Sequence, residues 1–117
     1  MNFEIKTTPE FERQAKPLNK RYKSFKTDLR DFILSLQENP FQGVELKPGI
    51  RKIRLAISSK GKGKSGGARV ITYTVLTSVE NGNVFLMNIY DKSDFSSVDT
   101  SIIEEMIKNL EIGDKNE

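Results

Sequence analysis

The chain has 117 residues, with no cysteine, no histidine and a formal net charge of +3. This length suits one domain with a single modest core, and the missing cysteines exclude a disulfide framework. The missing histidines exclude His-based acid/base catalysis and argue against a zinc site. Without a signal-peptide pattern or a run of apolar residues of membrane-spanning length, we expect a soluble cytoplasmic protein. We expect its domain to cover residues 1–112, with a polar tail at 113–117.

The first 40 residues predict a short strand followed by two helices. Apolar and polar residues alternate over 2–6, which is typical of a strand. Thr8 is then placed to cap a helix whose first turn begins with Pro9, and Pro17 is expected to kink or end that helix. Apolar residues at helical spacing predict a second amphipathic helix over about residues 22–38.

The middle of the chain predicts a β-hairpin with a long connection. Residues 41–49 read as a loop, and alternation over 51–57 predicts a strand with one face inward. The next stretch, 58–67, alternates glycine with lysine and holds no apolar side chain, so we expect it to be mobile and exposed. Residues 68–77 are rich in β-branched and aromatic side chains and predict the second strand.

The last third predicts one buried strand and one helix. An Asn-Gly turn precedes residues 84–90, which are almost wholly apolar, as in a strand covered on both faces. Residues 99–110 carry an apolar side at helical spacing, with Ser97 or Asp99 as the candidate cap. The apolar side of this helix is either core or a partner surface. The polar groups of residues 90–97 leave the sheet together, which makes them site candidates.

Positive charge is concentrated in residues 46–79. This segment has no Asp or Glu and contains eight cations: Lys47, Arg51, Lys52, Arg54, Lys60, Lys62, Lys64 and Arg69. Because the whole chain has 19 basic and 16 acidic residues, the remainder has 11 basic against 16 acidic. A field of this kind steers a polyanion to one surface.

The spacing of these cations suggests a phosphate backbone as the ligand. Lys52 and Arg54 lie on the outward side of their strand, roughly 7 Å apart at about 3.3 Å per residue. Adjacent phosphates are spaced similarly. Simpler roles stay open, since strand cations also protect sheet edges and loop lysines are often only solvated. Six basic residues over 13–26 either extend the binding surface or form a solvated helix face.

Two segments carry a resemblance to a known family. With KIRLAISSKGKGKSGGARVITY at residues 52–73 and IYDKSDFS at 89–96, the chain resembles toxins of the RelE/ParE superfamily of type II toxin-antitoxin systems. The similarity is greatest to the RelE/HigB-like branch. It implies an α+β, RelE-like fold in the order β-α-α-β-β-β-α. The implied antiparallel sheet is curved and has about four strands, with a helical hairpin on one face, a basic concave face opposite and a C-terminal helix.

The resemblance also implies a function. RelE-like members enter the ribosomal A site and cleave mRNA, so we expect a metal-independent endoribonuclease, an mRNA interferase, that arrests translation without a cofactor. The family's basic positions fall on Lys52, Arg54, Arg69 and Lys92. This chain has Phe95 where those nucleases place a tyrosine, so the phenol would come from Tyr90 or Tyr73. The expected RNA contacts are Lys47, Arg51, Lys60, Lys62, Lys64 and Tyr73.

This chemistry is also plausible from the residues themselves. When the 2′-hydroxyl of RNA attacks the neighbouring phosphate, cations must stabilise the phosphorane. We expect Lys52 and Arg54 to hold the developing charge and Arg69 to clamp the phosphate through two hydrogen bonds. Lys52 could act as the base only if the neighbouring arginines depress its pKa. No carboxylate cluster suggests a metal site.

Two other functions remain open. ParE-like relatives inhibit DNA gyrase without nuclease chemistry, and an inactive relative would bind RNA through the same basic face. The resemblance further implies three partners, namely the ribosome, mRNA and a cognate antitoxin of the helix-turn-helix type. No membrane partner is expected.

Overall fold

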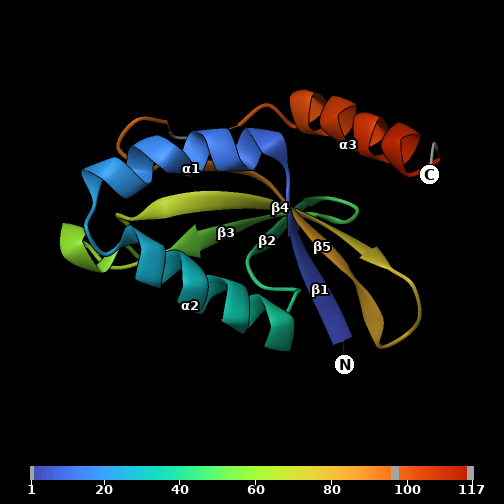
Figure 1. Cartoon of the computed structure of the whole chain (residues 1–117), viewed down its shortest axis with the longest axis horizontal. Helices are drawn as coiled ribbons and strands as arrows, with labels where there is room; N and C mark the ends of the chain where they lie inside the picture. Colours follow the sequence, from blue (N-terminus) through green and yellow to red (C-terminus); the bar gives the residue numbers. More distant parts are fainter. Residues whose placement is uncertain (1, 96–97, 116–117) are drawn as a thin grey trace.

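The computed structural model describes residues 2–95 and 98–115 of an α+β protein (Figure 1). Its elements are β1 (Asn2–Thr7), α1 (Pro9–Arg21), α2 (Phe25–Glu38), β2 (Val44–Lys47), β3 (Ile50–Leu55), the 3-10 turn η1 (Ser58–Lys60), β4 (Ala68–Leu76), β5 (Asn81–Asp91) and α3 (Thr100–Lys115). Within this described part, no helix is long and apolar enough to cross a membrane.

The strands form one mixed sheet in the order β1-β5-β4-β3-β2. The expectation of an antiparallel sheet of about four strands is wrong in two respects. First, β1 pairs in parallel with β5, because the chain crosses over through α1 and α2 before the sheet is completed. Second, part of the segment expected to be a loop forms β2, because a turn at Gly49, with φ of +81°, folds Val44–Lys47 back onto β3.

Thr8 caps α1 as expected, and its hydroxyl joins the helix to the sheet. Its oxygen accepts a hydrogen bond from the Phe11 amide at 3.2 Å and donates to the Leu86 carbonyl at 3.0 Å. The helix does not end at Pro17 but continues to Arg21, since Leu18 is buried in the core and holds the last turn in place. α2 therefore begins at Phe25, later than predicted.

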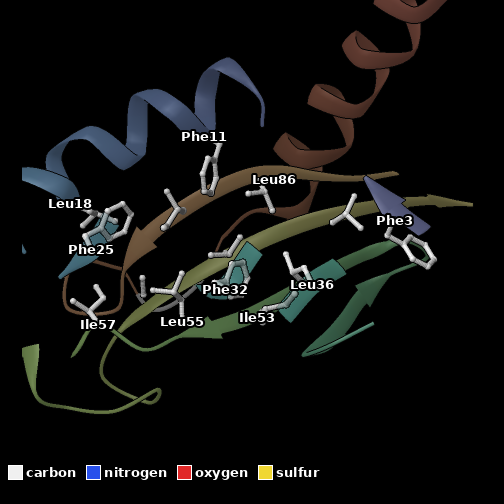
Figure 2. Close-up of a cluster of buried hydrophobic side chains, with 14 residues drawn as sticks. Phe3, Phe11, Leu18, Phe25, Phe32, Leu36, Ile53, Leu55, Ile57 and Leu86 are labelled. Carbon is white, nitrogen blue, oxygen red and sulfur yellow. The ribbon is translucent and has the colours of Figure 1, made fainter. Parts of the chain in front are cut away.

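The α1–α2 hairpin covers one face of the sheet. Figure 2 shows the side chains of the two helices meeting those of the strands in a single apolar cluster. The contributing core residues are Phe11 and Leu18 from α1, Phe25, Phe32 and Leu36 from α2, Phe3, Ile53, Leu55, Ala68, Val70, Val84, Leu86 and Ile89 from the strands, and Ile57 beyond the end of β3.

α3 packs against the opposite face of the sheet. Ile103 is fully buried and lies in a second cluster with Ile50, Ile71 and Met87. The Asp99 carboxylate accepts a hydrogen bond from the Ser101 amide at 2.9 Å, so Asp99 caps the helix; the other candidate cap, Ser97, lies outside the described residues. The helix continues to Lys115, beyond its predicted end and into the expected tail. On its apolar side, Ile103 is buried, Met106, Ile107 and Leu110 are partly buried against the second cluster, and Ile102 is exposed.

Candidate nucleic-acid interface

Strand pairing brings three of the expected catalytic residues into one row. Arg54 on β3 pairs directly with Arg69 on β4, and Arg69 pairs with Tyr90 on β5. Lys52 lies two residues before Arg54 and therefore on the same side of the sheet. Ile50 and Ile71 share this side and pack against α3, so the basic row lies on the α3 side and not under the helical hairpin.

A pocket of about 640 Å³ opens over this row. The cations that line it are Lys52, Arg54, Lys64, Arg69 and Lys92, and the rest of the lining is Gln42, Gly43, Val44, Leu46, Ile53 and Ser65. Among the described residues, no carboxylate lines the pocket. Four of the five expected catalytic residues thus come together, joined by one lysine expected to contact RNA. We call this the basic pocket.

Arg69 is the buried cation of the basic pocket, with only 6% of its surface exposed. Its guanidinium donates to the carbonyl oxygens of Lys64 at 3.2 Å, Ala68 at 3.2 Å and Ser65 at 3.0 Å. These acceptors are neutral, so they fix the guanidinium without neutralising its charge. A guanidinium has about five N–H donors in total, which leaves two for an incoming anion.

Neither expected phenol lines the basic pocket. The Tyr90 hydroxyl is buried and has no hydrogen-bond partner among the described residues, and its ring packs edge-on against Phe95 with centroids 6.0 Å apart. Burial raises the pKa of Tyr90, and the positive charge of Arg69 only partly offsets this. Tyr73 lies four residues from Arg69, roughly 13 Å along the strand, and stacks on Phe85.

Most of the expected RNA contacts lie away from the basic pocket. The Lys47 ammonium pairs with Glu104 of α3 at 3.1 Å, and Arg51 donates to the Phe41 carbonyl at 3.0 Å. Lys62 is exposed on the loop between β3 and β4. Among the expected contacts, Lys64 is the one that lines the basic pocket.

Lys60 has a different role from the other loop lysines, because its ammonium reaches the Asp91 carboxylate at 2.5 Å. Asp91 is only 1% exposed and also accepts hydrogen bonds from Arg21 at 3.0 Å and from the Tyr22 hydroxyl at 2.5 Å. Burial alone would raise the pKa of Asp91, but hydrogen bonds from Lys60, Tyr22 and Ser93 outweigh it and hold the pKa far below its usual range.

Sequence reasoning marked the polar stretch around Asp91 but missed this cluster. Lys60 and Arg21 lie 31 and 70 residues away from Asp91, and nothing local in the sequence links them. The residues that the structure describes contain no group of three or more Asp and Glu placed to hold a metal ion. A search of protein-family models gave no match to this chain.

Proposed function

We propose that this protein is the toxin of a type II toxin-antitoxin module, similar to the RelE/HigB-like branch, and that it cleaves mRNA on the ribosome. The observation that supports this best is the basic pocket, in which five cations gather and which no carboxylate lines among the residues that the structure describes. Such a site attracts a phosphate backbone strongly, because the charges that line it are all positive among the residues that the structure describes.

The pocket suits stabilisation of the phosphorane formed when the RNA 2′-hydroxyl attacks its own phosphate. In this mechanism, Arg69 donates its two free N–H groups to the non-bridging oxygens, held in place by the loop carbonyls. Lys52 and Arg54 add positive charge where negative charge develops. Solvent takes up the proton of the attacking 2′-hydroxyl, and an ammonium that lines the pocket, Lys52 or Lys92, protonates the departing 5′-oxygen.

One observation favours a second candidate function, RNA binding without cleavage. Because neither Tyr90 nor Tyr73 lines the basic pocket, the site lacks the phenol that the family resemblance led us to expect. A pocket with cations alone can hold phosphates without moving protons efficiently. Product analysis separates the two functions, whereas the salt dependence of binding does not.

A cognate antitoxin is the proposed partner, and an acidic segment of it would fit the basic pocket. Such a segment competes with RNA for the same five cations. The antitoxin therefore blocks the site by occupying it.

Cleavage-site mapping on a reporter mRNA in a translating extract, with and without ribosomes, tests the proposal. The test variant replaces Lys52, Arg54 and Lys92 by Ala. The matched control replaces Lys16, Lys20 and Lys23, which are equally charged but exposed on the helical hairpin and its connection. We expect cuts only on translated mRNA, lost in the first variant and kept in the second. RNA binding without cuts would support the second candidate, and neither binding nor cuts would leave gyrase inhibition to be tested.

A further inference from the structure

The loop of residues 58–67 forms one wall of the basic pocket through Lys64 and Ser65. It joins β3 to β4 and was expected to be mobile. Its first residues are instead tied to α2. The Asp28 carboxylate accepts hydrogen bonds from the Ser58 amide at 2.9 Å and the Ser58 hydroxyl at 2.7 Å.

Asp91 ties the same loop to the rest of the molecule. It receives the Lys60 ammonium from the loop, a guanidinium nitrogen of Arg21 at the end of α1 and the hydroxyl of Tyr22, which caps that helix. Its remaining partner is the Ser93 amide at 2.9 Å. A buried carboxylate is stable only when it is paired in this way. One side chain thus joins α1, the loop and the end of β5.

The far end of the loop is fixed as well. Arg69 holds the carbonyl groups of Lys64 and Ser65, and the Lys92 amide donates to the Gly67 carbonyl at 3.0 Å. Between the two anchored ends, Gly61 and Gly63 have φ of +73° and +63°, so the chain turns tightly there. The position of Lys64 therefore depends on both ends being held.

We infer that Asp91 is a positioning residue of the proposed RNA site: by binding Lys60 it fixes the loop that presents Lys64 to the basic pocket. Asp91 does not line the pocket, so its effect on RNA would pass through the loop. Lys60 is then a structural cation that holds the loop and not an RNA contact. The expected effect on RNA binding rests on the proposed function. The effect of Asp91 on the loop does not, and it can be measured without RNA.

RNA binding by the Asp91→Asn variant tests the inference, because two explanations predict changes of RNA affinity in opposite directions. Removing a carboxylate near a phosphate site strengthens binding if only net charge matters. If Asp91 positions the loop, binding weakens, because Lys64 no longer meets its phosphate. The probe is a short single-stranded RNA with 2′-O-methyl sugars, which cannot cleave itself. We expect about tenfold weaker binding. The slope of log K against log salt concentration should fall in magnitude by about one, as for loss of one phosphate contact.

Two comparisons make the binding result specific. Asp94→Asn removes a carboxylate that shares Arg21 with Asp91 but is 46% exposed. Because Asp94 has no contact with Lys60 among the described residues, we expect its loss to leave RNA binding unchanged or slightly tighter. Lys64→Ala should match Asp91→Asn in salt slope. The double variant Asp91→Asn, Lys64→Ala should bind RNA about as weakly as either single variant, since both changes remove the same contact between Lys64 and a phosphate.

Hydrogen exchange of the backbone amides of Lys60, Gly61 and Gly67, which donate to the carbonyl oxygens of Ile57, Ser58 and Lys64, tests the loop directly. We expect exchange to rise by about tenfold to a hundredfold in Asp91→Asn and in Lys60→Met, as for loss of a charged hydrogen bond. Lys60→Arg should keep the exchange low because it keeps the pair. If Asp91→Asn does not fold, Lys60→Met decides the matter, because it leaves Asp91 with Arg21 and Tyr22.

Unchanged exchange in a folded variant, or tighter RNA binding by Asp91→Asn, would overturn the inference. If the unmodified protein neither binds the RNA probe nor cuts translated mRNA, the proposed function fails, and the exchange result alone then decides whether Asp91 fixes the loop. The two failures are therefore distinguishable.

Discussion

Arg54 and Arg69 are directly opposite each other on β3 and β4, on the side of the sheet that carries α3. Like charges in this relation destabilise a sheet. No carboxylate lines the pocket that they share in the described part of the chain, so the repulsion is not relieved there. The pair costs stability, and a bound phosphate is the group that would remove this cost.

Arg54→Thr should therefore stabilise the free protein and weaken RNA binding. Arg54 is exposed and Thr suits a strand, so the free energy of unfolding should rise by about 0.2–1 kcal/mol. Urea unfolding measures this, and RNA titration measures the loss of affinity. Lys26→Thr, an exposed cation on α2, is the control and should not be stabilising. A less stable Arg54→Thr would contradict the argument.

Because of Asp91, the free energy of unfolding should fall at acidic pH. The pKa of Asp91 is depressed in the folded protein, so its contribution is complete above the unfolded value, near pH 4 for Asp, and declines as the pH falls toward the folded value. At about pH 7, Asp91→Asn should lower the free energy of unfolding by about 3 kcal/mol, since it breaks a buried ion pair. This difference should shrink below about pH 4. Denaturant unfolding across this range checks the trend, and a constant difference would refute it.

Packing of α3 on the sheet predicts different results for two neighbouring isoleucines. Ile103 is fully buried and Ile102 is 58% exposed. Ile103→Ala should cost about 2–5 kcal/mol of unfolding free energy, whereas Ile102→Ala should change it by less than about 0.5 kcal/mol. Thermal and urea unfolding of both variants give the comparison. Equal effects would mean that α3 does not hold this position on the sheet in solution.

Gly67 is closely packed where the loop returns to β4. A Cβ atom there would lie 2.1 Å from the Leu55 carbonyl oxygen, a backbone atom that cannot move without shifting β3. Gly67→Ala should cost about 1–3 kcal/mol and weaken RNA binding through the displaced loop. Gly61→Ala meets open space but must adopt φ of +73°, so a smaller cost of about 1 kcal/mol is expected. Unfolding and RNA titration of both variants test this ranking.

Local chemistry was enough to predict the helices and most of the strands. Thr8 and Pro9 mark the start of α1 because a cap needs only residues within one turn. The parallel pairing of β1 with β5 has no such local signal, since it depends on where the hairpin of helices returns the chain. β2 was missed because it is only four residues long and its pairing depends on the turn at Gly49.

Four of the five cations that line the basic pocket are among the expected catalytic residues, but the sequence does not show which lysine of the loop joins them. Lys60, Lys62 and Lys64 look equivalent in the sequence, yet one is paired with Asp91, one is exposed and one lines the pocket. The three lysines differ because of contacts with residues distant in the sequence, such as the pairing of Lys60 with Asp91. Lys52 and Arg54 were assigned to one side correctly because alternation along a strand is a local property.

The pairing of β1 with β5 has a consequence for biosynthesis. Asn2 meets Asn81, 79 residues later in the chain, so β1 has no strand partner until most of the domain has left the ribosome. Contacts of such long range also slow folding. β5 carries Asp91 and leads directly into Lys92, so the loop anchor and the last cation of the pocket arrive together with the strand that completes the sheet. A nascent chain released before β5 is made would lack all three, so the pocket is complete only after β5 has left the ribosome.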